Sequence, residues 1–512
     1  MEEVLSILSR RDTLLSKIDI RANSPLKRLF QTVHLKRECY INDLWEIVGY
    51  ETISTREDRR EELQRCVNWL LKRLMGLDVV AFGEPMGLQL MNESFKTIQM
   101  PSMIIGVIAK NPGRPTILVY GNVDVEDASM EEGWTTDPFV LTEIDEFLYG
   151  RGVALDKGPL LCWLNAIQSY RDAGMRLPVN LVFLIESMAH SNSLGLETVL
   201  RQRIGFFREV SCVAICTRRW ISNKRPGIIY GSRGLVYYHL EVECANRDLS
   251  SCEHGGTLYE ALPDLFYLLS TLVDGATTIL VEGLTSNYEV DMNVLQCADF
   301  NYRQFGRNVD SYLLPHKDSK VNALHSLWAM PHLSIHGIEG ANASPDLRFV
   351  IPHRVVGKFS VSMAPNQKAA LVTEALQKHL GLAWVERGSP NKMSLCEKFV
   401  IPSWTGAVDT PEYAAAVRAM HQTYDAMPNY IRDGGSILAP TIFREVLNKN
   451  VIVLPIASND NGGGPINERL SVENYVKGSQ MLSAFMWEYG EVGEDTDSEI
   501  KVNAICKPKS AK

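Results

Sequence analysis

The chain has 512 residues and a net charge of −9 at pH 7, and 45% of its residues are apolar. This length allows roughly two to four domains with buried cores. The acidic balance excludes nucleic acid and anionic membranes as partners, because no basic stripe is available to neutralise phosphates. The opening MEEVLSILSRRD is not a secretory signal, and no stretch has the roughly 18 apolar residues of a membrane span. We therefore expect a cytoplasmic protein.

The first part of the chain alternates helix and strand patterns. Ser54 and Glu57 stand at capping-box spacing, which predicts that a helix begins at Ser54. Further helices are predicted at 158–174 and 194–203, and strands at 103–107, 117–120, 179–185 and 210–216. Such alternation indicates an α/β fold with a mostly parallel sheet and helices on both of its faces. Ten scattered cysteines are typical of reduced, mostly buried thiols.

The pattern changes near residue 227. Residues 230–244 alternate as an antiparallel strand does, 258–273 resemble an amphipathic helix, and a second strand and helix follow between 355 and 381. This predicts a small α+β domain at 212–398, inserted into a discontinuous α/β domain formed by 1–211 and 399–490. The chain returns to that domain through a helix at 411–427, a strand at 451–456 and a helix from 472 to about 489. Residues 491–512 are polar and predict a disordered tail.

One strand leads directly to candidate chemistry. The apolar run 117–120 ends at Gly121, so Asp124 follows the carboxyl end of a buried strand, where open α/β sheets bind ligands. The motif GNVD at 121–124 is followed by YGRG at 149–152, DKG at 156–158 and PVNLVFLIESM at 178–188. The blocks RDLSSCEHGG, SIHGIEGA, VIPHRVVGKFSV, IRDGGSI and NERL follow in the same order.

Taken together, these motifs resemble the carnosinase and cytosolic non-specific dipeptidase branch of the di-zinc metallopeptidases, within the aminoacylase and carboxypeptidase-like superfamily. The resemblance covers roughly residues 25–490. It implies a catalytic-like α/β domain, with an inserted lid domain that is used for dimer formation. It also implies two zinc ions held by His, Asp and Glu side chains, with a free carboxylate as the general base.

Most of the implied catalytic positions hold residues that cannot perform this chemistry. The general base falls on Ala189, while the acid that would orient a metal-bound histidine is kept as Asp124. The positions aligned with metal ligands are Asn122, Leu155, His190, Thr217 and Gly464. His190 is the only residue among them with a good zinc donor, and one ligand does not make a zinc site. Without their partners, Asp124 and the neighbouring acid Asp156 are most simply interpreted as turn or helix-terminus residues. We therefore expect no cofactor, with Zn or Mn as the alternative.

The residues implied in substrate handling are changed as well. The histidine that a second subunit contributes in that family falls on Ser250, with His254 four positions further on, and the substrate-binding arginine falls on Ser362. The family's carboxylate-binding turn is kept as Arg432, Gly434, Gly435 and Ser436, which predicts a site for an anionic or peptide-like small molecule.

Two hypotheses remain. The first is a catalytically degenerate dipeptidase-like protein, a pseudoenzyme, that acts as a binding or regulatory scaffold. It would be a homodimer or a heterodimer with a related dipeptidase. The second is an active metal-dependent dipeptidase that uses a reduced or shifted metal site, for example His190 with Asp124 and Asp156. The count of ligands favours the first hypothesis.

Overall fold

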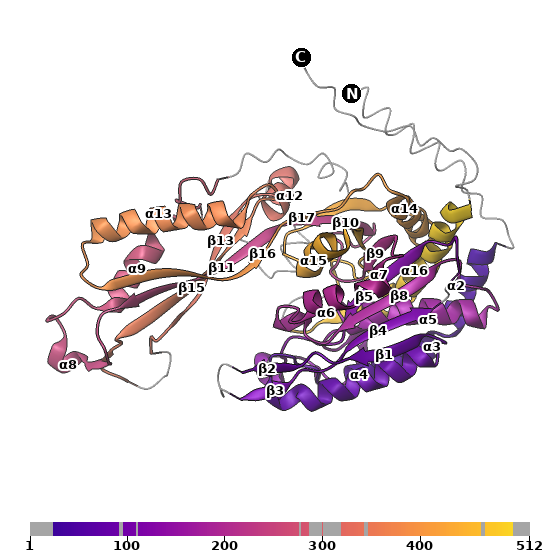
Figure 1. Cartoon of the computed structure of the whole chain (residues 1–512), viewed down its shortest axis with the longest axis horizontal. Helices are drawn as coiled ribbons and strands as arrows, with labels where there is room; N and C mark the ends of the chain where they lie inside the picture. Colours follow the sequence, from indigo (N-terminus) through magenta and orange to yellow (C-terminus); the bar gives the residue numbers. More distant parts are fainter. Residues whose placement is uncertain are drawn as a thin grey trace, which may run out of the picture.

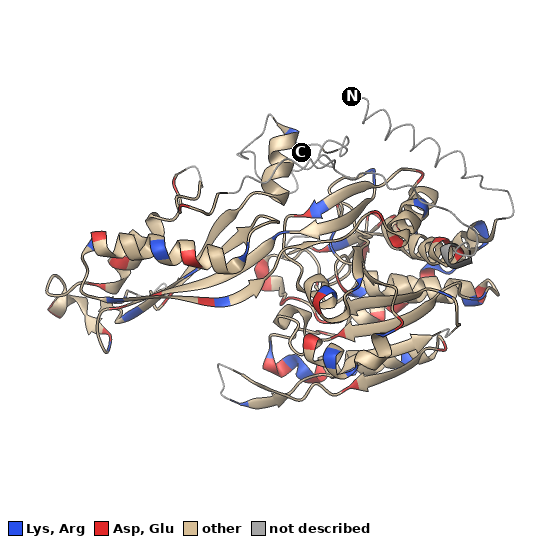
Figure 2. Ribbon diagram, turned by 45° about the horizontal axis from the view of Figure 1, so that its top comes forward, with Lys and Arg blue, Asp and Glu red and all other residues tan. Residues whose placement is uncertain are grey.

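The computed structural model describes residues 24–91, 96–108, 111–275, 278–285, 300, 319–342, 347–461 and 466–494. The chain forms a large α/β unit and an elongated insertion that extends from it, on the right and left of Figure 1. Lys and Arg residues are interspersed with Asp and Glu residues over both parts (Figure 2). In the part of the chain described, no helix is both long enough and apolar enough to cross a bilayer.

A nine-stranded sheet forms the centre of the large unit. Its four middle strands run parallel, as predicted, whereas the strands toward both edges include antiparallel pairings. In spatial order, the strands are β1 (Val80–Glu84), β4 (Met103–Ile108), β8 (Asn180–Glu186), β5 (Thr116–Asn122), β9 (Cys212–Ile215), β19 (Asn450–Val453), β10 (Gly227–Ser232) and β17 (Trp404–Thr405), with β18 (Asn429–Asp433) paired to β10.

Helices cover both faces of this sheet. They are needed on both because successive apolar side chains of β5 point to opposite faces and all of them are buried. Ile117 and Val119 are buried in one apolar cluster, while Leu118 and Tyr120 are buried in another. The first cluster is shared with α2 (Pro25–Leu35), α3 (Arg37–Val48), α4 (Arg60–Met75), α5 (Lys157–Asp172), α14 (Pro411–Tyr424) and α16 (Val472–Glu494). The second is shared with α6 (Leu196–Gln202), α7 (Ile204–Phe207) and α15 (Leu438–Leu447).

The predicted helix start at Ser54 is wrong. A 3₁₀ turn at Glu57–Arg59 precedes α4, and no side chain caps the helix. Ser54 is fully buried, and its hydroxyl oxygen accepts a hydrogen bond from Ser191 Oγ at 2.9 Å. The neighbouring Thr52 donates to the Val123 carbonyl oxygen at 2.7 Å. Residues 52–54 are therefore held beside the end of β5, and the Ser54 side chain does not cap α4.

A four-stranded antiparallel sheet forms the insertion, in the order β13 (His332–Glu339), β15 (Arg354–Met363), β11 (Gly234–Glu243) and β16 (Lys392–Ile401). Helices α9 (Ala261–Ser270) and α13 (Ala369–Arg387) pack on one face of it. Strands β9 and β10, which the predicted boundary at residue 212 assigned to the insertion, pair within the large sheet instead. Their apolar side chains are buried on both faces, as a central strand of the large sheet requires.

Shorter elements complete the described chain. In the large unit these are the hairpins β2 (Leu88–Leu90) with β3 (Thr97–Gln99) and β6 (Thr142–Ile144) with β7 (Phe147–Tyr149), and β20 (Arg469–Ser471), which pairs with β7. In the insertion they are β12 (Leu249–Ser250), β14 (Val350–Ile351) and α8 (Ser251–His254). Helix α12 (Lys320–Trp328) lies between α8 and β14 in sequence but packs on the large unit, where Leu324 and Trp328 are buried in the second apolar cluster. The last helix continues to Glu494, past its predicted end, and the rest of the predicted tail lies outside the described residues.

Candidate functional site

The candidate site lies where the parallel strands β5, β8 and β9 end. Asn122 is the last residue of β5 and is paired with Glu186, the last residue of β8. A short 3₁₀ turn, Ala189–Ser191, follows β8, and Thr217 follows β9. Parallel strands place their carboxyl ends at one edge of the sheet. The fold therefore brings Asn122, Ala189 and Thr217 to the edge that the sequence predicted, while Gly464 lies outside the described residues.

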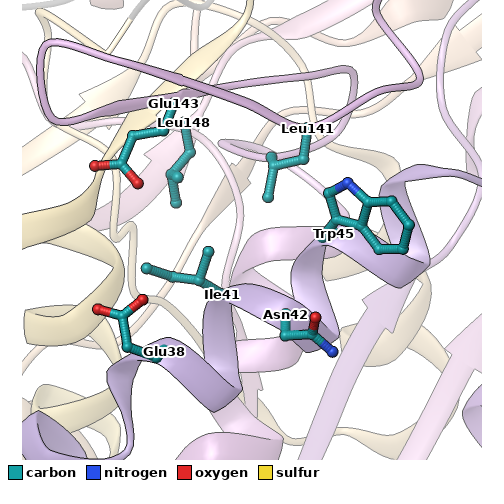
Figure 3. A pocket seen from close by; sticks show the side chains of 7 residues that line it. All are labelled: Glu38, Ile41, Asn42, Trp45, Leu141, Glu143 and Leu148. Atoms are coloured by element: carbon teal, nitrogen blue, oxygen red, sulfur yellow. The ribbon is translucent and has the colours of Figure 1, made fainter.

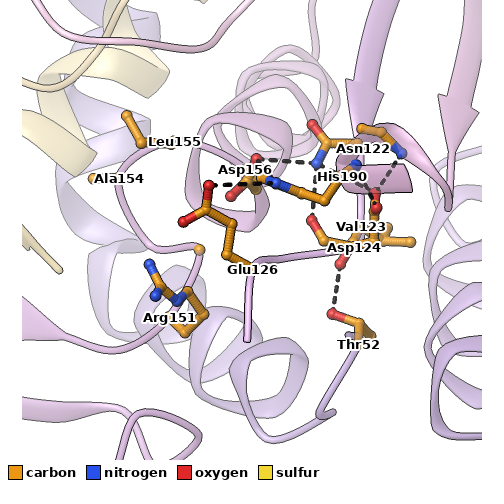
Figure 4. Close-up of polar contacts among 12 residues, drawn as sticks. Thr52, Asn122, Val123, Asp124, Glu126, Arg151, Ala154, Leu155, Asp156 and His190 are labelled. Carbon is orange, nitrogen blue, oxygen red and sulfur yellow. Dashed lines mark hydrogen bonds and ion pairs between the residues drawn. The ribbon is translucent and has the colours of Figure 1, made fainter. Parts of the chain in front are cut away.

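Asn122 connects the two retained acids (Figure 4). Its side-chain nitrogen Nδ2 donates to Asp156 Oδ1 at 3.0 Å and to the backbone oxygen of Asp124 at 2.9 Å. A longer contact of 3.5 Å joins the same nitrogen to Asp124 Oδ1. Asn122 and Asp156 are each 9% exposed, and Asp124 is fully buried. An amide N–H group therefore occupies the space between these acids and already satisfies part of their hydrogen-bonding capacity.

The carboxylate of Asp124 is held by the backbone of the turn after β8. The N–H groups of Ala189 and His190 donate to its two oxygens at 3.0 and 2.8 Å. Burial raises the pKa of Asp124, and the neighbouring His190, the Ser54 hydroxyl and the His190 N–H partly offset this effect. Asp124 therefore fixes the turn to the end of β5, which is a structural role.

His190 is held next to Asp156. Its Nε2 lies 3.3 Å from Asp156 Oδ1, and its Nδ1 lies 4.0 Å from Glu126 Oε1 (Figure 4). Burial acts to lower the pKa of His190, but Asp156, Asp124 and Glu126 outweigh it and raise the pKa to about 9. The imidazole is therefore mostly protonated at neutral pH, and a metal ion would have to displace this proton in order to bind.

Glu468 holds the loop that carries Leu155. Its carboxylate accepts hydrogen bonds from the N–H groups of Gly152, Ala154 and Leu155 at 2.8, 2.9 and 3.3 Å. The guanidinium of Arg151 lies 3.5 Å from Glu468 Oε2. Burial and Asp156 raise the pKa of Glu468, whereas the N–H groups and Arg151 act to lower it. Glu468 thus fixes the backbone of this loop, although the side chain at position 155 is apolar.

The predicted anion-binding turn is engaged by the protein itself. Arg233 Nε donates to the Gly434 carbonyl oxygen at 2.7 Å, and Arg218 Nη2 donates to the Ser436 carbonyl oxygen at 2.8 Å. The N–H of Gly435 donates to Asp433 Oδ1 at 2.8 Å, so it is not available to grip a ligand as predicted. Arg432 is buried, lies over the ring of Tyr230 and donates to Thr405 Oγ1.

The remaining predicted residues lie in the insertion. Ser250 belongs to β12, and His254 ends α8 with its side chain 46% exposed. Helix α8 lies at the far end of the insertion from β5 and β8 (Figure 1). Ser362 lies on β15, paired with Leu235 and His332. Within one chain, the structure therefore does not bring Ser250 and His254 to the sheet edge that holds Asp124.

The residues at the sheet edge do not fit the two zinc ions that the resemblance implies. The side chains of Leu155 and Ala189 offer no lone pair, Asn122 directs N–H groups at both acids, and His190 is a single imidazole engaged by Asp156. In the described ranges, no group of three or more His, Cys, Asp or Glu residues is arranged to hold a metal ion. No catalytic step through zinc follows from this arrangement.

Comparisons with known proteins place the fold in its family. Residues 118–488 match Peptidase family M20/M25/M40. The human Beta-Ala-His dipeptidase is 34% identical over 91% of this chain and 93% of its own length. The Cys-Gly metallodipeptidase of Candida albicans is 32% identical over 91% of this chain and 98% of its own length. The crystal structure of human carnosine dipeptidase 1 matches with a TM-score of 0.85 at 33% identity, covering 92% of this chain and 99% of that one.

The chain therefore belongs to Peptidase family M20/M25/M40, and it is similar to the dipeptidases of that family over nearly its whole length. This confirms the resemblance inferred from the motifs.

Sequence reasoning missed three polar residues at the sheet edge, namely Ser54, Glu126 and Glu186. Glu186 carried a signal, because it is the one acid at the end of the apolar run PVNLVFLIE. Its side chain is fully buried, and Oε1 accepts hydrogen bonds from the hydroxyls of Tyr120 and Ser193. In the part of the chain described, Oε2 has no hydrogen-bond partner. Burial, followed by the charge of Asp124, raises the pKa of Glu186 to about 8.

Because its pKa is raised, ionisation of Glu186 at high pH lowers the free energy of unfolding. In the unfolded chain the carboxyl ionises near pH 4.5, whereas the folded protein keeps it protonated up to about pH 8, so stability falls as pH rises between these values. We expect Glu186→Gln to raise the free energy of unfolding by about 3 kcal/mol more at pH 8 than at pH 5. Urea unfolding at the two pH values measures this difference. The matched variant Glu197→Gln, at an exposed residue of α6, should change both values by less than about 0.5 kcal/mol. An equal effect of Glu186→Gln at both pH values would contradict the assignment.

Proposed function

We propose that this protein is a dipeptidase-like pseudoenzyme of the cytoplasm, a dimeric binding or regulatory scaffold that does not hydrolyse peptides. One observation carries the proposal: Asn122 Nδ2 donates to Asp156 Oδ1 at 3.0 Å and lies 3.5 Å from Asp124 Oδ1, in the space where a di-zinc peptidase needs a cation. A cation placed there would have to displace these N–H groups and would find no carboxylate at Leu155 to bridge it to a second ion.

The missing general base supports the same conclusion. In a metallopeptidase, a free carboxylate takes a proton from the attacking water. The aligned residue, Ala189, has no group that accepts a proton, and its N–H is used to hold Asp124. Glu126, a second acid beside His190, is 61% exposed and lies 4.0 Å from the imidazole, with which it forms an ion pair. Such a protein can bind a ligand without hydrolysing it, because the fold is formed and Glu468 holds the loop of residues 151–155 in place.

The proposal also includes a partner subunit and a ligand, which similarity to the dipeptidases suggests. The names of the relatives describe dipeptidases. We propose that a second copy, or a related active dipeptidase, pairs through the insertion. We also propose that a peptide-like or anionic small molecule binds at the turn of Gly434 and Ser436. Arg218 and Arg233 donate to the carbonyl oxygens of this turn. The turn is therefore preorganised, which lowers the entropy lost when a ligand binds.

A second candidate function is weak dipeptide hydrolysis at a reduced metal site. The cluster of His190 with Asp156 and Glu126, at 3.3 and 4.0 Å, is the observation that favours it. Because the raised pKa of His190 makes a metal ion compete with a proton, the affinity of such a site for metal would increase with pH.

Metal content and activity, measured on the same sample, decide between the two functions. The purified protein is incubated with Zn²⁺ or Mn²⁺, desalted, analysed for metal and assayed with dipeptides, with human Beta-Ala-His dipeptidase as the positive control. We expect well under one equivalent of tightly held metal and no hydrolysis above background, because the site lacks its ligands. About two equivalents, removed by a chelator together with dipeptide cleavage, would support the second candidate instead.

A further inference from the structure

A hollow of about 400 Å³ lies on the large unit, between α3 and the hairpin formed by β6 and β7 (Figure 3). Helix α3 forms one wall and the hairpin forms the other. The lining residues are Glu38, Ile41, Asn42, Trp45, Leu141, Glu143 and Leu148. Leu148 is buried, and Ile41 and Leu141 are partly buried against the main apolar core, so the floor of the groove is continuous with that core.

The two ends of this groove differ in chemistry. Figure 3 shows the carboxylates of Glu38 and Glu143 at one end and the indole of Trp45 at the other. Trp45 is 55% exposed, which is unusual for so large an apolar side chain in a soluble protein. Glu38 forms an ion pair with Arg37, but both side chains are exposed, so the pair is weak and can exchange partners. An apolar segment with cations at one end matches the groove.

The chain has such a segment within reach. Residues 4–11 read VLSILSRR, in which Val4, Ile7 and Leu8 stand at the i, i+3 and i+4 spacing of helix-in-groove ligands and two arginines follow. The described chain begins at Ser24, and α2, about 16 Å long, leads directly from there to α3. Residues 12–23 form a tether that can span at most about 40 Å, so residues 4–11 can reach the groove. Because the tether is short, the effective concentration of the segment is in the range of about 1 mM.

We propose that residues 4–11 of this chain bind in the groove between α3 and the β6–β7 hairpin of the same chain. Val4, Ile7 and Leu8 would cover the apolar floor and Trp45, and Arg10 and Arg11 would meet Glu38 and Glu143. Strand β7 leads through Gly150 into the loop that Glu468 holds, so an occupied groove would also brace that loop. Residues 4–11 would thus be an intramolecular ligand of this groove, which lies on the large unit and not on the insertion.

Photo-crosslinking in the full chain tests this. A benzophenone amino acid replaces Leu8, the protein is irradiated, and the linked peptides are mapped by mass spectrometry. We expect the links in residues 37–48 and 141–148. The double variant Glu38→Arg with Glu143→Arg should lower the yield of these links about tenfold, because two charge pairs become repulsive. Adding Arg10→Glu and Arg11→Glu should restore the yield, which a merely unfolded groove could not do.

Two further arms identify the occupant. A mixture of ¹⁵N-labelled and unlabelled chains should give links within single chains only, and mixed-isotope links would assign the groove to a second copy and overturn the proposal. The same probe in place of Leu15, in the tether, should give no groove links. Links from position 15 but none from position 8 would place a different segment in the groove. Groove links from position 8 that are unaffected by charge reversal would also contradict the proposed contacts.

Discussion

Replacing the residues at the sheet edge by the family's metal ligands and general base is expected to turn a protein that does not retain zinc into one that holds about two ions per chain. The set is Asn122→His, Leu155→Asp, Ala189→Glu, His190→Glu, Thr217→Asp and Gly464→His. These changes return three donors to each ion, with the carboxylate at position 155 shared by both, and they remove the amide that now joins Asp124 to Asp156. Zinc at about 100 times its dissociation constant should then raise the free energy of unfolding by about 2.7 kcal/mol per site. Metal analysis after desalting and thermal unfolding with and without zinc measure both effects.

The control replaces three of the six positions by neutral amides of similar shape, Leu155→Asn, Ala189→Gln and His190→Gln, and leaves Asn122, Thr217 and Gly464 as they are in the natural protein. It should bind no more metal than the natural protein, because amides are weak zinc ligands. If the restored variant is folded but gains no metal, the positions have been aligned wrongly with the family's ligands. Gain of metal in the amide control would show that the edge binds ions without carboxylates.

Loss of Glu468 is expected to cost about 3 kcal/mol of folding free energy. In Glu468→Ala, the N–H groups of Gly152 and Ala154 lose a buried acceptor, and Arg151, whose side chain is 6% exposed, loses its carboxylate partner. Each unsatisfied buried group costs about 1–3 kcal/mol. The midpoint of urea unfolding measures the loss.

A matched acid on the neighbouring helix serves as the control. Glu473 pairs with Lys477 at 2.7 Å, one turn apart on α16, and its side chain is 70% exposed. Glu473→Ala should therefore change the free energy of unfolding by less than about 0.5 kcal/mol. Equal losses in the two variants would mean that the loop does not depend on the carboxylate of Glu468.

Much of the fold could be predicted because strong local patterns agree with it. The apolar runs 117–120 and 179–185 are strands of the large sheet, and the return of the chain after the insertion restores that sheet. The start of the insertion was predicted too early because β10, Gly227–Ser232, joins the large sheet through β18 and β19, which lie about 200 residues further along the chain. Ser54 was misassigned for a similar reason, since its partner Ser191 is distant in sequence.

The candidate site was predictable in position but not in contacts. The order of motifs located Asn122, Asp124 and His190 at strand ends, and the structure places them there. The sequence could not reveal that Asn122 donates to Asp156, nor that Glu126 approaches His190, because these contacts depend on side-chain directions across three separate loops. It also could not reveal that the Gly435 N–H is taken by Asp433, since the motif is the same whether the turn is engaged or open.

The position of β19 has a consequence for synthesis of the chain on the ribosome. This strand, Asn450–Val453, inserts between β9 and β10, and α16 packs on α5, which lies about 310 residues earlier. Until almost the entire polypeptide has emerged, the nascent chain exposes apolar strand edges at β9 and β10, the condition under which chains self-associate. The large sheet can therefore be completed only after residues 450–494 have been made, whereas the four strands of the insertion all lie between Gly234 and Ile401 and can pair earlier.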